Sequence, residues 1–213
     1  MKTYLKKLFN SGQWQSEGQV SRRVYKSYEE YVEHQKAKLA KVGNPERKIA
    51  RLRQGLGERL AAMPEIKHGT NALCLAARFG GEVGAFIDRG VFAIGIDLNP
   101  GPDNKYVVVG DFHDLQFSDA SIDCVFTNSL DHVFDFDRVM TEVQRVLKPT
   151  GHFIAEIAFG DDAVAGEYES FWYESADTLI SKIEGTGFDL LRKADYAVPL
   201  IGVSALFRSR KAK

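Results

Sequence analysis

The sequence predicts an α/β fold built on a mostly parallel sheet. From residue 70 onward, short apolar runs typical of buried strands alternate with amphipathic segments typical of helices. Strands that are joined through helices are parallel, because a parallel pair needs a long crossover. The last two predicted strands, residues 190–198 and 203–208, have only residues 199–202 between them, so this pair is predicted to be antiparallel.

Seven strands are expected in this region. They occupy residues 72–75, 91–97, 106–109, 122–127, 153–157, 190–198 and 203–208. A helix over residues 136–147 has Val139, Met140 and Val143 on one face, and Ser175 is the predicted cap of a later helix.

Composition places the chain among ordinary globular proteins. It has 213 residues, 44% hydrophobic and 27% charged, with a net charge of −1. The two cysteines exclude a disulfide framework, and neither belongs to a CxxC metal motif. No apolar run approaches the ~20 residues of a membrane span, and the N-terminus has no apolar signal core, so we expect a cytoplasmic protein.

The first part of the chain has a character of its own. Residues 1–65 are predicted to form a helical cap or lid, followed by the main domain at 66–213. Ser27 and Glu30 have the spacing of a capping box. Residues 1–60 carry 14 basic and 6 acidic side chains, a charge of +8. This charge indicates either a solvated face or a surface that meets an acidic substrate.

A second predicted helix in this region follows a stop signal. Gly43 ends the first helix, and Asn44 and Pro45 supply an N-cap and a first-turn proline for the next one.

The turn after the first strand is a candidate ligand site. Backbone N–H groups and a positive helix end meet at such a turn, where they can bind a ligand. Only Gly80 and Gly81 are glycines here, so the GxGxxG phosphate fingerprint is absent. A generic strand-to-helix turn explains the segment equally well.

Two acidic residues follow the next strands. Asp97 ends an apolar strand about 20 residues beyond the first turn, the offset at which an acid binds a ribose diol in nucleotide-binding α/β folds. Asp111 and Phe112 follow the third strand, where a carboxylate and an aromatic ring suit a purine. The alternative for each acid is a turn-capping role.

The order of these motifs resembles the class I S-adenosylmethionine-dependent methyltransferases of the type 11 group. The resemblance runs from Gly80 through Gly-Ile-Asp97, Gly-Asp111-Phe112 and Asp123-Cys-Val-Phe to Arg145-Val-Leu-Lys-Pro-Thr-Gly151. It implies a Rossmann-like, doubly wound, seven-stranded sheet with one reversed strand, and S-adenosylmethionine as the cofactor.

The resemblance also implies a role for each matching position. Gly80 and the backbone of Ala76 would line the methionine part of the cofactor. Asp97 would hold the ribose, with Leu98 beside the adenine. The remaining positions, also at strand ends, would contact the adenine rim (Asp111, Phe112) and the region near the sulfonium (Asn128).

The sequence departs from this family in its first motif. The family has an acid at the position of Cys74 and glycines at those of Ala76 and Arg78. One hypothesis is that Arg78 pairs with the carboxylate of the cofactor while Glu82 serves its ammonium group. The alternative is that Arg78 points to solvent.

A proton acceptor is expected after the fourth strand. His132 is the candidate base, because its pKa lies near neutrality, with Asp131 and His113 as reserves. A core or helix-start histidine is the alternative. Spacing matches no metal signature, so no metal is expected.

The predicted activity is O-methylation of a saccharide or another small metabolite. It rests on the aromatic and acidic insertion at residues 160–173, together with the N-terminal helices over the cleft. A non-catalytic cofactor-binding module on the same fold stays open. The net charge argues against a nucleic-acid methyltransferase, and the missing fingerprint argues against a nicotinamide oxidoreductase. The sequence leaves a homodimer open.

Overall fold

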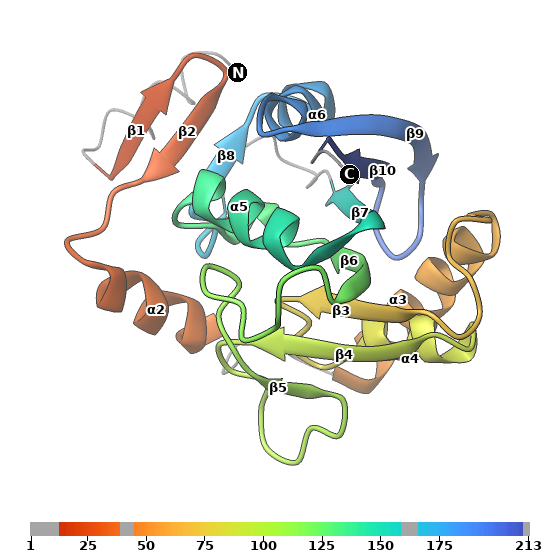
Figure 1. The fold of residues 1–213 in the computed structure, drawn as a ribbon. Coiled ribbons are helices and arrows are strands. Elements are labelled where there is room, and N and C mark those ends of the chain that lie inside the picture. Colours follow the sequence, from red (N-terminus) through yellow and green to blue (C-terminus); the bar gives the residue numbers. More distant parts are fainter. Residues whose placement is uncertain (1–12, 39–44, 159–165, 211–213) are drawn as a thin grey trace.

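A seven-stranded sheet forms the centre of the protein, seen in a computed structural model that describes residues 13–38, 45–158 and 166–210. The strand order is β5-β4-β3-β6-β7-β10-β9 (Figure 1). The strands of this sheet are β3 (Asn71–Leu75), β4 (Phe92–Asp97), β5 (Val107–Val109), β6 (Ile122–Thr127), β7 (Leu147–Ala158), β9 (Phe188–Tyr196) and β10 (Gly202–Ser209).

The direction of the strands confirms the predicted topology. β5, β4, β3, β6 and β7 run parallel to their neighbours, whereas β10 is antiparallel to both β7 and β9. The carboxyl ends of the parallel strands therefore meet at one edge, where ligands bind in open α/β sheets.

Helices cover both faces of this sheet (Figure 1). The helices are α2 (Tyr28–Ala37), α3 (Pro45–Ala61), α4 (Gly81–Asp88), α5 (Phe136–Val146) and α6 (Ala176–Gly185), with a short 3-10 turn η2 (Leu130–His132). Alternate residues of β3 enter two separate cores: Leu73 packs with the core of α5 and α6, and Cys74 with that of α3 and α4. This alternation follows from the two-residue repeat of a strand.

The N-terminal region is not entirely helical, contrary to the prediction for residues 1–65. It contains the strands β1 (Trp14–Glu17) and β2 (Val20–Arg23), which pair as a hairpin. β2 also pairs with β8 (Phe171–Tyr173), about 150 residues later in the chain. A local pattern cannot reveal this partner, because the ladder that stabilises the short hairpin comes from a distant segment.

The rest of the N-terminal region packs on the main domain in two ways. α3 contributes the fully buried side chains Leu56 and Leu60 to the core of α4, so it belongs to the body of the protein. α2 contributes Tyr31, 1% exposed, to the opposite core. The domain boundary at residues 65/66 stays a prediction, but only α2 has the position of a lid.

The predicted helix caps are confirmed where the structure describes them. The Ser27 hydroxyl accepts a hydrogen bond from the Glu30 N–H at 3.3 Å, and Ser175 does the same for Thr178 at 3.1 Å. α3 begins at Pro45 as expected. The expectations for Gly43 and Asn44 lie outside the described residues. Within the described ranges, no helix combines the length and the apolarity that a membrane span needs.

A buried ion pair ties α3 to β7. Glu156, 4% exposed, accepts two hydrogen bonds from the Arg59 guanidinium, one of them 2.7 Å long from Nη2 to Oε2. The same guanidinium lies 4.2 Å from the ring centroid of Tyr196 and donates to the Val198 carbonyl at 2.7 Å. Arg59 thus joins α3, β7 and the end of β9.

Arg59→Met should lower the free energy of unfolding by about 3–5 kcal/mol, because it leaves the Glu156 charge buried without a partner. Urea denaturation at pH 8 measures this change. Arg53→Met is the matched control, since its partner Asp88 is half-exposed and the loss should be at most ~1 kcal/mol. Equal losses in the two variants would contradict the buried-pair interpretation.

Candidate functional site

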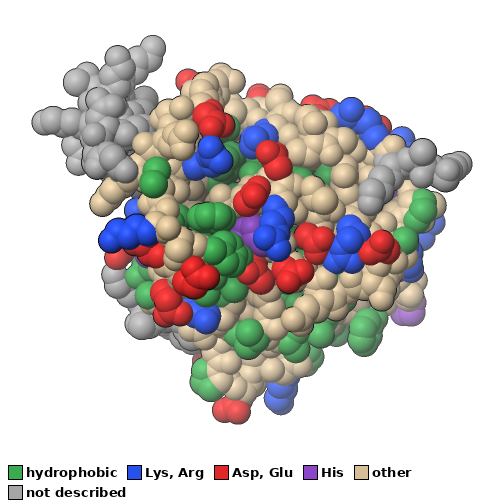
Figure 2. Space-filling model, turned by 60° about the vertical axis from the view of Figure 1, so that its left-hand side comes forward, with side chains coloured by type: hydrophobic (Ala, Val, Ile, Leu, Met, Phe, Trp, Pro, Cys, Tyr) green, Lys and Arg blue, Asp and Glu red, His purple; other side chains and the backbone are tan. Residues whose placement is uncertain are grey.

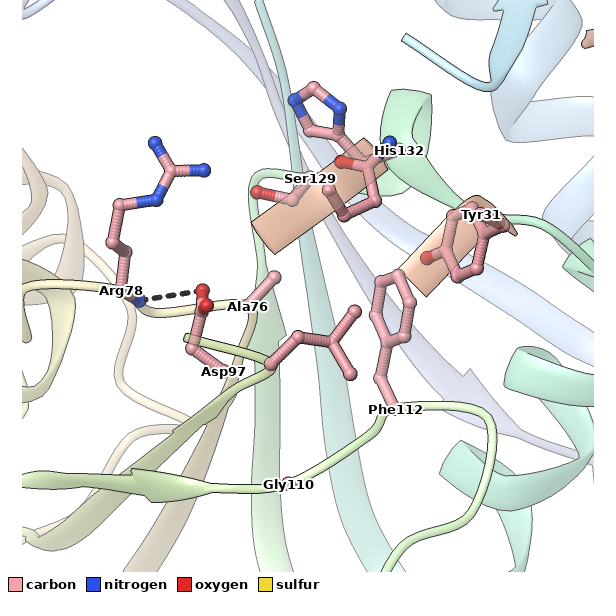
Figure 3. Close-up of a pocket in the computed structure, with 10 residues that line it drawn as sticks. Tyr31, Ala76, Arg78, Asp97, Gly110, Phe112, Ser129 and His132 are labelled. Atoms are coloured by element: carbon pink, nitrogen blue, oxygen red, sulfur yellow. Dashed lines mark hydrogen bonds between the residues drawn. The ribbon is translucent and has the colours of Figure 1, made fainter. Parts of the chain in front are cut away.

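Two adjoining cavities open at the carboxyl edge of the parallel strands. The first, called here the Asp97 cavity, has a volume of about 430 Å³ including the part open to solvent (Figure 3). It is lined by Tyr31, Gln35, Ala76, Arg78, Asp97, Leu98, Gly110, Phe112, Ser129 and His132. The second, the Glu82 cavity, measures about 1130 Å³ on the same basis. Both cavities share Ala76, Arg78, Ser129 and His132, so they form one continuous site.

The loop after β3 has an unusual backbone. Ala76 and Arg78 adopt positive φ angles of 52° and 35°, and Gly80 has a φ of 78°. A side chain at positive φ costs about 1–2 kcal/mol, so glycine is the residue normally found there. The loop therefore keeps the shape that glycines would allow although two of its positions are not glycine. Such strain persists only where the surroundings impose it.

Asp97 imposes part of this shape. Its Oδ2 accepts a hydrogen bond from the Arg78 N–H at 3.0 Å (Figure 3). Its Oδ1 accepts one from the Asn99 N–H at 2.8 Å. Each carboxylate oxygen has about two acceptor sites, so each keeps one for a ligand. The Arg78 guanidinium extends away from this carboxylate. A diol donor in the cavity would meet two free acceptor positions.

The walls beside Asp97 are apolar. Leu98 and Phe112 line the cavity, and Tyr31 closes it from α2. A flat aromatic base fits between such side chains, because its faces are apolar while its edge is polar. Asp97, Leu98 and Phe112 are thus brought together as the sequence predicted.

The Asp111 carboxylate makes hydrogen bonds within the protein that the sequence did not predict. Its Oδ2 accepts from the Tyr28 hydroxyl, and its Oδ1 accepts from the backbone N–H and Nδ1 of His113 at 2.8 and 2.9 Å. Asp111 is not among the residues that line the Asp97 cavity, whereas its neighbours Gly110 and Phe112 are. In the structure this carboxylate anchors α2 through Tyr28, and its contact with the adenine stays a prediction.

His113 shares this structural role. Its ring is 1% exposed, and Nε2 accepts from the backbone N–H groups of Phe134 and Asp135, both at 3.2 Å. Both ring nitrogens are therefore engaged, so His113 is not available as a reserve base. In the described part of the chain, no group of three or more His, Cys, Asp or Glu side chains could hold a metal ion.

Glu82 is a buried acid in the wall of the Glu82 cavity. It lies in the first turn of α4 and is 5% exposed. Its Oε1 accepts from the Asn128 side-chain amide at 3.2 Å, while Oε2 is buried without a hydrogen-bond partner. Burial raises the pKa of this carboxyl to about 7. Nearby Cys74 is fully buried, and burial together with the Glu82 carboxyl raises the pKa of its thiol.

His132 is held at both ring nitrogens. Nδ1 donates to the Tyr168 carbonyl at 2.8 Å, so Nε2 is the acceptor, and Lys38 Nζ lies 2.7 Å from it. Asp131 Oδ2 is 3.6 Å from the same Nε2. Burial lowers the pKa of His132, and the Lys38 charge adds to this effect although Asp131 opposes it. Burial likewise lowers the pKa of Lys38 to about 8.

Lys38 and Glu156 belong to this site although the sequence did not predict them. Lys38 follows α2 with no distinguishing pattern, and only the packing of α2 brings it to His132. Glu156 lines the Glu82 cavity, and here a signal existed, since an acid in an apolar strand is rarely buried without a partner. Burial raises the pKa of Glu156, an effect that Arg59 opposes.

Phe171, Trp172 and Tyr173 of the predicted insertion do not line the two cavities, and residues 160–165 of that insertion lie outside the described residues. Phe171 is 2% exposed and stacks on Phe136 in the core, at 5.2 Å between ring centroids. Trp172 and Tyr173 belong to β8, and neither of them lines the two cavities. Charges around the site are mixed: Figure 2 shows acidic and basic side chains interspersed on that face, not a continuous basic surface.

Comparison with known proteins points to one family. Residues 73–155 match the sequence profile of a methyltransferase domain. No curated protein sequence matches the chain.

Solved structures share the fold over most of the chain. The 1,6-didemethyltoxoflavin-N1-methyltransferase of Burkholderia thailandensis, solved with S-adenosylhomocysteine, is 13% identical with a TM-score of 0.66 and covers 92% of this chain and 99% of its own. A SAM-dependent methyltransferase of Aquifex aeolicus is 17% identical with a TM-score of 0.58 and covers 80% and 97%. A cyclase, SpnF, is 16% identical with a TM-score of 0.57 and covers 72% and 79%. At these identities the likeness shows the fold.

Ala76→Gly should leave the free energy of unfolding unchanged or raise it by up to ~1 kcal/mol. Glycine removes the strain of the positive φ, which roughly offsets its larger entropy in the unfolded chain. Ala50→Gly in α3 is the control and should cost about 1 kcal/mol, because that alanine lies within a helix. Urea denaturation measures both. A loss at Ala76 as large as that at Ala50 would contradict the strained loop.

Proposed function

We propose that this chain, a class I S-adenosylmethionine-dependent methyltransferase, methylates a hydroxyl oxygen of a saccharide or another small metabolite. The observation that carries the proposal is the junction of the two cavities at Ser129 and His132. The partly apolar Asp97 cavity ends there, beside the larger Glu82 cavity, which charged side chains line and which can admit an acceptor. A candidate base lies at the junction itself.

The described residues fit the cofactor. In this proposal, the free acceptor positions of Asp97 receive the ribose hydroxyls, and Leu98 and Phe112 enclose the adenine. Ala76 and Gly80 hold the loop that faces the methionine part. Arg78 pairs with the carboxylate of the cofactor, and Asn128 lies near its sulfonium. The support is the cavity lining and the free lone pairs of Asp97.

When bound, the cofactor supplies a methyl group that its sulfonium already makes electrophilic. The chain has to place the acceptor oxygen in line with the bond between the sulfonium sulfur and its methyl group, and it has to exclude water. Positioning of this kind can contribute up to about 7–11 kcal/mol to lowering a barrier. Tyr31 and Gln35 of α2 close the Asp97 cavity and serve this purpose.

His132 removes the proton of the acceptor hydroxyl in this mechanism. Its Nδ1–H is held by the Tyr168 carbonyl, which keeps the Nε2 lone pair as the only basic position. The acceptor hydroxyl would take the place of Lys38 at Nε2 and give its proton to that nitrogen. The methyl group would pass from sulfur to the acceptor oxygen, which breaks the S–CH₃ bond and leaves S-adenosylhomocysteine. Asp131, 3.6 Å away, stabilises the resulting imidazolium.

Two measurements test the proposal. Native mass spectrometry of the purified protein should find retained S-adenosylmethionine or S-adenosylhomocysteine. Labelled methyl transfer is then measured on matched panels of hydroxyl and amine acceptors, saccharides among them. Transfer to hydroxyl acceptors supports the proposal, and transfer only to amines refutes the oxygen assignment. Bound cofactor without transfer to any acceptor would favour the binding-module alternative.

Asp97→Asn should weaken the binding of both S-adenosylhomocysteine and adenosine by about 10-fold or more. The amide replaces one acceptor oxygen by a donor, which faces either a backbone N–H or the ribose. Isothermal titration calorimetry measures both affinities. Asp103→Asn, at an exposed aspartate, is the control and should bind like the parent. Unchanged affinity in Asp97→Asn would remove the ribose assignment.

Lys38→Met should move the acid limb of the kcat/KM profile to higher pH. His132 acts in its neutral form, so activity falls as the pH drops through its pKa, which burial and Lys38 hold below the usual ~6.5. Removing the neighbouring cation raises that pKa. Lys36→Met, on the same helix, is the control and should leave the limb in place. An unmoved limb in Lys38→Met would mean that the proton goes to another group.

A further inference from the structure

Glu82 has a carboxyl oxygen for which the folded chain provides no partner. We infer, on the basis of the proposed function, that Glu82 binds the ammonium group of the methionine part of the cofactor and loses a proton when it does so. The negative charge that meets the ammonium group then comes from α4, because Cys74 on β3 is uncharged. It also makes cofactor uptake dependent on pH.

The first observation that supports the inference is the position of Glu82. Its side chain lines the Glu82 cavity, which meets the Asp97 cavity at Ala76 and Arg78. An Asn128 amide donates to Oε1 at 3.2 Å and so fixes the carboxyl group against the end of β6. Oε2 is left buried and unsatisfied in the same wall. A buried acceptor without a partner destabilises the folded chain, and a bound donor would recover that loss.

The sequence at β3 supports it second. Cys74 is uncharged and fully buried, and burial and the Glu82 carboxyl keep its thiol protonated by raising its pKa. The thiol therefore offers no negative charge to a cationic ligand. Glu82 lies near enough to influence that thiol, so the carboxylate can serve the same region from the neighbouring element.

Among the described acids that line the Glu82 cavity, only Glu82 has a buried oxygen without a hydrogen-bond partner. Glu156 is bound by Arg59 through both oxygens, and Asp97 lines the Asp97 cavity and not this one, with its free acceptor positions assigned to the ribose. The remaining titratable side chains that line the same cavity are Lys38, Lys48, Arg78, Asp131, His132 and Tyr196. Of the two acids that raise the pKa of Glu82, Glu156 and Asp97, neither carries a buried oxygen without a partner among the described residues.

Proton release follows from the electrostatics. Because burial raises the pKa of Glu82 to about 7, part of the empty protein carries a proton there at neutral pH. An ammonium ion beside the carboxyl favours the charged form and lowers that pKa. Binding therefore expels the proton, and affinity for the cofactor should rise as the pH rises from 6 to 8.

The test compares two ligands and two variants by isothermal titration calorimetry. S-adenosylhomocysteine contains the ammonium group, whereas 5′-methylthioadenosine lacks the whole amino-acid part. Glu82→Gln keeps the shape and the Asn128 contact but removes the charge. We expect it to bind S-adenosylhomocysteine about 10- to 100-fold more weakly, the range for a hydrogen bond to a charged group. Its affinity for 5′-methylthioadenosine should equal that of the parent, which also shows that the variant is folded.

The number of protons released is measured in buffers of different ionisation enthalpy at pH 7. The parent should release more protons on binding S-adenosylhomocysteine than Glu82→Gln does, and its affinity should rise more steeply between pH 6 and 8. Because His132 and Lys38 are present in both proteins, their titration cancels in this difference. Glu58→Gln, at an exposed glutamate of α3, is the matched control and should behave like the parent.

The outcomes separate this inference from the function on which it rests. If Glu82→Gln binds S-adenosylhomocysteine as tightly as the parent, or releases as many protons, the ammonium assignment is wrong and the methyltransferase site stands. If the parent binds 5′-methylthioadenosine but Glu82→Gln loses both ligands equally, the residue acts only on the fold, and the inference fails. If the parent binds neither ligand, the proposed function fails with it.

Discussion

The contact between Asp97 and the backbone of Arg78 is the constraint on which the rest of the site depends. It joins the end of β4 to the loop after β3, and it holds that loop in a conformation that its own residues disfavour. The strain at Ala76 and Arg78 is local, while the parallel pairing of β3 and β4 that positions the contact extends over five residue pairs. A rigid sheet can therefore keep an unfavourable loop in place.

A second network sets the position of α2. Tyr28 donates to Asp111, and the side-chain amide of Asn99 donates to the Lys36 carbonyl at 3.2 Å, so the helix is fastened near both ends to loops that follow β4 and β5. Tyr31, Gln35 and Lys38 reach the site only because of this position. Asp111 thus holds the helix that covers the Asp97 cavity.

Buried acids give the Glu82 cavity its character. Glu156 is neutralised by a two-point contact with Arg59, whereas Glu82 has one amide donor and an open oxygen. In the low-dielectric wall of this cavity, a hydrogen bond to either carboxyl group is stronger than in water, and a carboxyl oxygen without a partner is destabilising. Glu156 therefore belongs to a structural ion pair, whereas Glu82 is in a position to bind a charged ligand.

The sequence by itself determined the alternation of strands and helices, the reversed strand β10, the caps at Ser27 and Ser175, and the place of Asp97 at a strand end. These features depend on local periodicity and on short connections, which a single sequence displays. Only the tertiary structure decided the pairing of β2 with β8, the contact of Asp111 with Tyr28, and the contact of Lys38 with His132. In each case the partners are separated by about 80 to 150 residues, and side chains with several hydrogen-bonding choices take the partner that packing brings nearest.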